Sequence, residues 1–145
     1  MTISSFLILG LAAGCSQPAV TGPDSQTQEG NGVKSHGALR VEGASLCDEN
    51  GNPVVLRGMS SHGISWYPRY LNGGAMKTLK EYGANLFRIA AYTEPSGAYL
   101  ENPDRTLDYL YMGAESALAE DLYVILDWHI LNDSDPNEHI EEAKD

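Results

Sequence analysis

The sequence predicts an α/β fold with a parallel sheet, and within that class a (β/α)8 TIM barrel of which the N-terminal hairpin and about three βα units are present. Strand-like apolar segments end near residues 59, 90 and 126, and helical patterns fill the intervals between them. Glycines spaced to cradle a phosphate follow none of these strands, which disfavours a doubly wound nucleotide-binding sheet. Polar and aromatic residues gather instead at the strand ends, where a barrel carries its active site.

The N-terminal segment predicts export. Residues 3–13 are apolar and match the core of a signal peptide, but they are too few for the about 20 residues that cross a bilayer. The following LAAGC at 11–15 resembles a bacterial lipobox, which makes Cys15 a candidate lipidation site. An ordinary cleaved signal and a buried helix are the alternatives. We expect residues 1–15 to be a signal peptide and the protein to reach the cell surface or the medium, with a lipid on Cys15 as its link to a membrane.

Residues 16–37 predict a flexible polar linker, because this segment has hardly an apolar side chain to offset the entropy of ordering. Residues 38–145 are then the N-terminal part of the barrel domain. Alternating residues over 39–55 predict a β-hairpin whose turn is the DENGN segment at 48–52. Residues 54–59 predict the first strand of the barrel.

The rest of the chain alternates between helical and strand-like patterns. A first helix is predicted where Ala75, Met76, Leu79 and Tyr82 fall at helical spacing, and Gly83 ends it. Residues 85–90 and 122–126 predict buried strands, and residues 138–145 predict the start of a further helix. Between the two strands, one apolar stripe predicts a helix through Leu107, Leu110, Tyr111, Ala114, Ala117 and Leu118.

Composition limits the partners of the protein. The net charge of −11 at pH 7 excludes nucleic acid, because phosphates would be repelled, whereas a neutral glycan is compatible. Two cysteines are too few for a disulfide framework. His62 and His129 lack the spacing of zinc-binding motifs. We therefore expect no metal and no cofactor, and we expect a monomer.

The residues at the predicted strand ends suit a sugar, whose ring face stacks on an aromatic plane while its hydroxyls form directional hydrogen bonds. They are Ser60, Ser61, His62, Trp66 and Tyr67 after the first strand, Arg88, Tyr92 and Glu94 on the second, and Asp127, Trp128 and His129 on the third. Other interpretations stay open. Arg88 must meet a carboxylate, and that ion pair could be purely structural. Either tryptophan could be a core residue, and Asp127 could cap a loop or orient a neighbour.

The strand-end segments 52–63, 83–90 and 123–129, followed by DPN at 135–137, resemble glycoside hydrolase family 5, in its bacterial endoglucanase branch. The resemblance covers residues 38–140. It implies a (β/α)8 barrel and retaining hydrolysis of β-1,4-linked glucans, in which one glutamate attacks the anomeric carbon and another protonates the leaving oxygen. The implied partner is a β-glucan polysaccharide.

The resemblance also implies roles for residues of this chain. Arg88 would hydrogen-bond the nucleophile and keep it ionised. His62 and His129 would line the cleft at the reacting sugar, so that these three residues support catalysis. The substrate-binding residues would be His62 and His129 together with Trp66 and Tyr92, which match aromatic positions near the glycone subsites.

Neither catalytic glutamate can be assigned, because the family places them on the fourth and seventh strands and the third strand is the last one predicted here. A barrel needs about 250 residues. We therefore expect the 145 residues alone to be poorly folded and without hydrolase activity. A mannanase or other β-glycanase on the same barrel is the nearest alternative, and a non-catalytic carbohydrate-binding lipoprotein is another.

Overall fold

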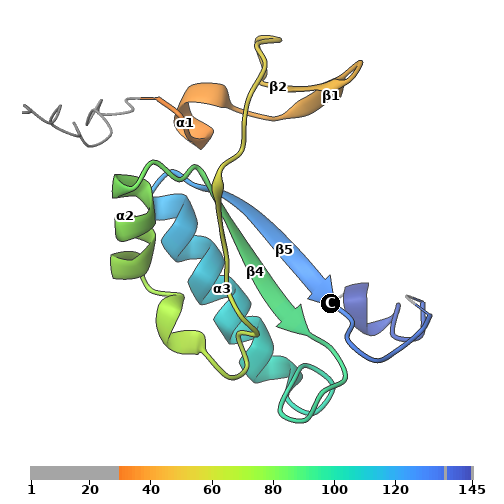
Figure 1. Ribbon diagram of the computed structural model, residues 1–145. Coiled ribbons are helices and arrows are strands. Elements are labelled where there is room, and N and C mark those ends of the chain that lie inside the picture. Colours follow the sequence, from red (N-terminus) through yellow and green to blue (C-terminus); the bar gives the residue numbers. More distant parts are fainter. Residues whose placement is uncertain (1–29, 136, 145) are drawn as a thin grey trace, which may run out of the picture.

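The computed structural model describes residues 30–135 and 137–144, which form a parallel sheet with helices on one side and a hairpin at one end (Figure 1). The predicted signal peptide, Cys15, and the linker up to residue 29 lie outside the described residues. The sheet has the order β3-β4-β5, with strands Gly58–Ser60, Leu86–Tyr92 and Tyr123–His129, all parallel. This confirms the predicted α/β class.

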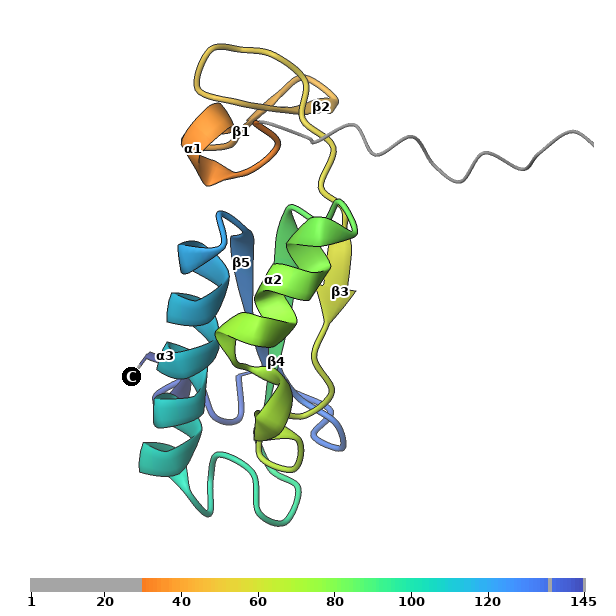
Figure 2. The same ribbon diagram turned by 90° about the vertical axis from the view of Figure 1, so that its left-hand side faces the viewer.

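Helices α2 (Gly73–Glu81) and α3 (Pro103–Ala119) cover the same face of the sheet (Figure 2). The side chain of Asn72 caps α2 by accepting a hydrogen bond of 3.1 Å from the amide of Ala75, and a proline opens α3. The core lies between these helices and the sheet, and its fully buried members are Leu71, Met76, Ile89, Ala117 and Leu122 with Ile64.

The pleat of β4 and β5 sorts side chains between the two faces of the sheet. Phe87, Ile89 and Ala91 belong to the core under the helices. Arg88 and Tyr92 therefore point to the other face, which would be the inside of a barrel. The register pairs Arg88 with Ile125, Ala90 with Asp127 and Tyr92 with His129, so that polar residues of both strands share this inner face.

The N-terminal hairpin differs from the prediction. Strands β1 (Arg40–Glu42) and β2 (Ser45–Cys47) are antiparallel, and the turn between them is at Gly43, where φ is +61°. The predicted turn at 48–52 is present as a second turn, and Cys47 and Pro53 form an antiparallel bridge across it. The carboxylate of Asp48 holds this turn by accepting 2.9 and 2.8 Å bonds from the amides of Asn50 and Asn52. The first barrel strand begins at Gly58 rather than at residue 54.

The end of the expected linker, residues 30–37, holds the short helix α1 (Val33–His36) and packs on the domain. The amide of Lys34 donates to Asp121 Oδ1 at 2.8 Å, and the hydroxyl of Tyr123 donates to the carbonyl of Gly37 at 2.8 Å. Lys80 Nζ donates to Asn31 Oδ1 at 2.8 Å. These bonds hold α1 and its neighbouring residues against the N-terminal ends of the strands (Figure 1).

Three predicted core residues of the helices are exposed: Tyr82 by 88%, Tyr111 by 65% and Leu118 by 53%. Tyr82 lies just past the last residue of α2 and so leaves its stripe. Tyr111 and Leu118 are two turns apart on one side of α3, where no described element covers them. The predicted C-terminal helix is only a short 3₁₀ turn at Glu142–Lys144 among the described residues.

Both edges of the sheet are unpaired among the described residues. Met59 on β3 and Leu126 on β5 are 62% and 61% exposed. A barrel pairs every strand with two neighbours, so this sheet has the form of part of a barrel.

None of the described helices has the length and hydropathy that a membrane span requires.

Candidate functional site

Arg88, Asp127 and His129 form a polar cluster on the inner face of the sheet. Arg88 Nη2 lies 2.5 Å from Asp127 Oδ2, and the same oxygen lies 2.9 Å from His129 Nδ1. Arg88 Nη2 is also 3.3 Å from His129 Nδ1. The side chains of Arg88 and His129 are about one third exposed, at 34% and 32%, so the cluster is open to a ligand while its charges are paired.

The C-terminal end of β3 is tied to this cluster by two serines, the last residue of the strand and the one that follows it. Ser60 Oγ accepts a hydrogen bond of 2.6 Å from Arg88 Nη1, and Ser61 Oγ accepts one of 2.9 Å from the amide of Ala90. The guanidinium therefore has Ser60 on one side and Asp127 on the other. Two rigid strands flank Arg88, which limits the directions in which its planar fork can point.

Five rings lie together beside the polar cluster. The ring of Tyr92 has its centroid 4.4 Å from that of His129, 5.1 Å from that of Trp66 and 6.2 Å from that of His62. The ring of Tyr67 lies edge-on to that of His62, with centroids 5.0 Å apart. Trp66 is 40% exposed and Tyr67 is 45% exposed. The cluster therefore offers aromatic faces to the solvent next to hydrogen-bonding groups.

Gly63 makes this cluster possible. A Cβ atom at this position would lie 2.4 Å from the ring of Trp66 and 2.8 Å from the ring of Tyr92. The amide of Gly63 donates a hydrogen bond of 2.7 Å to His62 Nδ1. Because Nδ1 accepts this bond, the proton of the neutral His62 ring is on Nε2, which is then a donor.

Glu94, just after β4, joins two loops rather than facing a ligand. Its Oε1 accepts hydrogen bonds from the amides of Leu131, at 2.8 Å, and Asn132, both after β5. Burial of the carboxylate raises its pKa, but these amides, the Glu94 amide and the Thr93 hydroxyl outweigh burial and lower the pKa from 4.5 to about 2. Glu94 thus holds the two loops together as a carboxylate.

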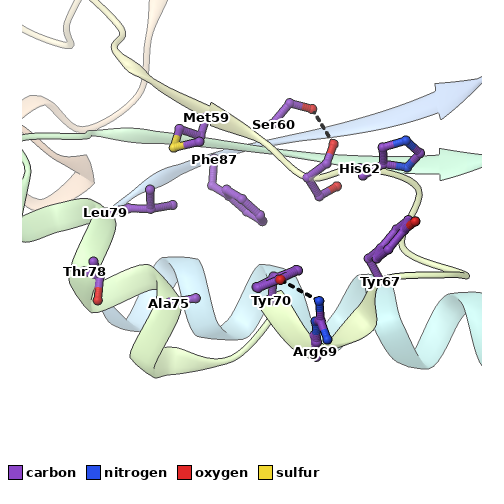
Figure 3. A pocket seen from close by; sticks show the side chains of 11 residues that line it. Met59, Ser60, His62, Tyr67, Arg69, Tyr70, Ala75, Thr78, Leu79 and Phe87 are labelled. Carbon is purple, nitrogen blue, oxygen red and sulfur yellow. Dashed lines mark hydrogen bonds between the residues drawn. The ribbon is translucent and has the colours of Figure 1, made fainter.

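A pocket of about 550 Å³ lies along the unpaired edge of β3, between that strand, α2 and the short helix Pro68–Tyr70 (Figure 3). Met59, Leu79 and Phe87 form its apolar side, and Tyr70 faces them. Arg69 Nη2 donates to the hydroxyl of Tyr70 at 2.8 Å. Ser60, His62 and Tyr67, which belong to the candidate site, also line this pocket, so it adjoins that site. Its apolar part lies where a closed barrel places another strand.

One group in the described chain has the ligand types of a metal site. Ligand atoms of Asp133, Glu138 and His139 lie within 4.8 Å of one another. His139 Nε2 is already 3.2 Å from Asp133 Oδ2, and Glu138 is exposed, so the contact between the histidine and the aspartate accounts for the arrangement. His62 and His129 are not members of this group.

The structure brings the predicted catalytic and substrate-binding residues to the C-terminal ends of the strands, and Cys15 lies outside the described residues. Arg88, His129, Tyr92, His62 and Trp66 lie in the two adjoining clusters. Trp128 does not, because it points to the helix side, where its ring packs edge-on against Tyr99 with centroids 4.9 Å apart. Sequence reasoning left Asp127 and Tyr67 out of the predicted site, although both were noted at strand ends.

Known proteins resemble this chain closely. Residues 47–145 match the family described as Cellulase (glycosyl hydrolase family 5). An endoglucanase of Clostridium saccharobutylicum is 40% identical over 126 residues, which are 86% of this chain and 28% of that protein. Endoglucanase E-5 of Thermobifida fusca is 42% identical over 125 residues, which are 84% of this chain and 27% of that protein.

Solved structures of endoglucanases have the same fold over most of this chain. The catalytic domain of Thermobifida fusca endoglucanase Cel5A (E5) matches with a TM-score of 0.74 and 40% identity, over 79% of this chain and 38% of that chain. A further structure of that domain is a variant in complex with cellotetraose, and it matches equally well. The chain thus spans less than a third of the length of the two curated relatives, and the match confirms that the fold is part of a (β/α)8 barrel. The chain belongs to glycosyl hydrolase family 5, the cellulase family.

Proposed function

We propose that this chain is part of a retaining endo-β-1,4-glucanase that hydrolyses cellulose or a related glucan. The observation that carries the proposal is the contact between the aromatic and polar clusters, where Tyr92 and His129 have ring centroids 4.4 Å apart. Relatives named endoglucanases support the reaction class, and the cellotetraose complex of one of them supports the substrate class.

The two clusters have complementary tasks in binding a glucan. The ring faces of Trp66 and Tyr92 supply apolar planes for the sugar rings. His62 offers its Nε2 proton to a hydroxyl, and Arg88 and His129 offer polar atoms at the inner end of the site. A neutral polysaccharide also meets no repulsion from a chain with a net charge of −11.

Retaining hydrolysis needs two carboxylic acids about 5 Å apart, one as the nucleophile and one as the acid and base. We propose that both come from barrel strands beyond the three described here. Glu94 is not a candidate, because its carboxylate is held by the amides of Leu131 and Asn132. Arg88 would stabilise the ionised nucleophile with its guanidinium, and His62 and His129 would hold the sugar at the reacting position.

The test uses the longer polypeptide in which this chain would supply the first strands. It is incubated with carboxymethylcellulose, mannan and xyloglucan, and reducing ends are counted. We expect carboxymethylcellulose to be cleaved fastest, and proton NMR of a cello-oligosaccharide digest to show the β-anomer first. Faster cleavage of mannan would make the protein a mannanase, and glucan binding without cleavage would make it a binding protein.

We also propose that the protein is exported and carries a lipid on Cys15, for which the support is the apolar segment at 3–13 followed by LAAGC. In a bacterial host, the wild-type protein would partition into the detergent phase of a cell extract. Replacement of Cys15 by alanine would move it to the aqueous phase. Equal partitioning of both proteins would show that no lipid is attached at Cys15.

A further inference from the structure

Asp127 touches both of the polar residues to which the proposed function gives a catalytic task. Its Oδ2 is 2.5 Å from Arg88 Nη2 and 2.9 Å from His129 Nδ1. The register of β4 and β5 sets Asp127 opposite Ala90, whose methyl group leaves room for the carboxylate to reach Arg88, two residues back on β4. The contact thus follows from the sheet and does not depend on a flexible loop.

The geometry determines where the imidazole of His129 carries its proton. Arginine only donates hydrogen bonds, so Asp127 Oδ2 accepts from Arg88. A bare Nδ1 on His129 would turn its lone pair toward the same negatively charged oxygen at 2.9 Å. Nδ1 therefore carries a proton and donates a hydrogen bond to Asp127 Oδ2. The 3.3 Å between Arg88 Nη2 and His129 Nδ1 is then a contact between two donors that share one acceptor.

The rest of His129 is also held. Its carbonyl accepts hydrogen bonds from the hydroxyl and the amide of Thr93, at 2.9 and 3.1 Å, and Thr93 is fully buried. The ring of Tyr92 packs against the imidazole at 4.4 Å. With the backbone and one ring face fixed and Nδ1 bonded, the second ring nitrogen, Nε2, is the atom left for a ligand.

We propose that Asp127 is a positioning residue of the reaction. It holds His129 in the Nδ1–H tautomer, so that Nε2 can accept a hydrogen bond from a sugar hydroxyl, and it fixes the direction of the Arg88 guanidinium. This role rests on the proposed function, because Asp127 acts through Arg88 and His129, which line the substrate cleft in that proposal. A carboxylate that orients a histidine through Nδ1 in this way is a recurring device in enzymes.

The first test is spectroscopic and needs no activity. In the longer polypeptide with ¹⁵N-labelled histidine, the signal of His129 is assigned by its loss in the variant His129→Gln. We expect the ¹⁵N shifts of the wild-type protein to show a protonated Nδ1 and a bare Nε2. We expect Asp127→Ala to move the ring toward the Nε2–H form. A bare Nδ1 in the wild-type protein overturns the proposal, even if every Asp127 variant fails to fold.

The second test separates positioning from folding. We expect Asp127→Ala to lower kcat on carboxymethylcellulose on the order of 10- to 100-fold and to change KM less, because the aromatic planes that bind the glucan are kept while His129 and Arg88 lose their alignment with the reacting sugar. Asp127→Asn keeps an oxygen that can accept from Nδ1 and should recover part of the loss. Asp108→Ala, which removes an exposed carboxylate from α3, is the matched control and should equal the wild-type enzyme.

The outcomes distinguish this proposal from the proposed function. An unchanged kcat in Asp127→Ala overturns the positioning role, whichever tautomer the variant adopts. The positioning role is also overturned if two results occur together: the loss of kcat in Asp127→Ala equals the loss of folded protein measured by circular dichroism, and His129 keeps its wild-type tautomer. If the wild-type polypeptide cleaves no β-glucan, the proposed function fails, and the ¹⁵N spectrum still decides whether Asp127 sets the tautomer of His129.

Discussion

The carboxylate of Glu94, which follows β4, accepts a hydrogen bond of 2.8 Å from the backbone amide of Leu131, which follows β5. The amide of Asn132 donates to the same oxygen. One side chain thereby joins two of the loops that border the candidate site. Because these bonds favour the charged form, the pKa of Glu94 is about 2 in the folded protein.

We expect Glu94→Gln to lower the free energy of unfolding above pH 4.5. A carboxylate whose pKa is depressed on folding stabilises the protein above its unfolded pKa, and this contribution is lost as the pH falls from about 4.5 toward 2. The difference between the variant and the wild type in urea unfolding should therefore shrink over this range. Glu115→Gln on the exposed side of α3 is the control. A difference that stays constant from pH 7 to pH 3 would show that the charge of Glu94 is not responsible.

Asp48 should behave in the same way at the other end of the sheet. Its pKa is lowered from 3.8 to about 2, first by the amide of Asn52 and against the effect of burial. We expect Asp48→Asn to lower the urea midpoint at pH 7 and to lose this effect as the pH falls from about 3.8 toward 2. Asp108→Asn should leave the midpoint unchanged. Equal midpoints for Asp48→Asn and the wild type at pH 7 would exclude a stabilising role for this carboxylate.

Gly63→Ala should disturb the aromatic cluster. The added methyl group would meet the ring of Trp66 at 2.4 Å, so the ring or the backbone must move, and we expect a loss of about 1–3 kcal/mol of stability. Tryptophan fluorescence should shift as the environment of Trp66 changes. The matched control is Gly73→Ala in the first turn of α2, where a methyl group meets nothing within 4 Å. Identical spectra and stability for Gly63→Ala and the wild type would mean that the rings are not packed as described.

Trp66→Ala should weaken glucan binding. Stacking of an aromatic ring contributes about 0.5–1.5 kcal/mol, so KM for a cello-oligosaccharide should rise roughly 2- to 10-fold while kcat changes less. Tyr82→Ala removes an aromatic side chain that is 88% exposed and remote from the strand ends, and it should not alter KM. If both variants raised KM equally, Trp66 would have no specific place in the substrate site.

The main elements of the fold could be predicted because buried parallel strands form nearly continuous apolar runs, as residues 85–90 do apart from Asn85 and Arg88. The limits of the helix stripes could not, because the spacing of Tyr111 and Leu118 is helical whether or not a neighbour covers them. The predicted turn at 48–52 is present, since Cys47 and Pro53 form an antiparallel bridge across it. The turn at Gly43 was not predicted, because Gly43 and Ala44 are weaker turn residues than the DENGN segment. Both segments reverse the chain, and only the structure shows that the three-residue ladder of β1 and β2 crosses the first turn while a single bridge crosses the second.

The location of the site could be predicted from the sequence, but one of its contacts could not. Alternation along a strand shows that Arg88 and Tyr92 share a face, and parallel topology shows that strand ends meet. Neither pattern shows which residue of β5 lies opposite Ala90, because that pairing depends on the register of the two strands. The contact of Asp127 with Arg88 was therefore left open, while the general location of the site was expected.

The most direct test of a glucanase site at these strand ends is the rate of carboxymethylcellulose hydrolysis by the longer polypeptide with Arg88→Lys. Lysine keeps the charge but cannot contact Ser60 and Asp127 at once as the planar guanidinium does. We expect kcat to fall on the order of 100-fold, with the unfolding midpoint nearly unchanged. Arg57→Lys, at the opposite end of the sheet, should keep the wild-type rate. Wild-type hydrolysis by Arg88→Lys would contradict the account and place the reaction elsewhere.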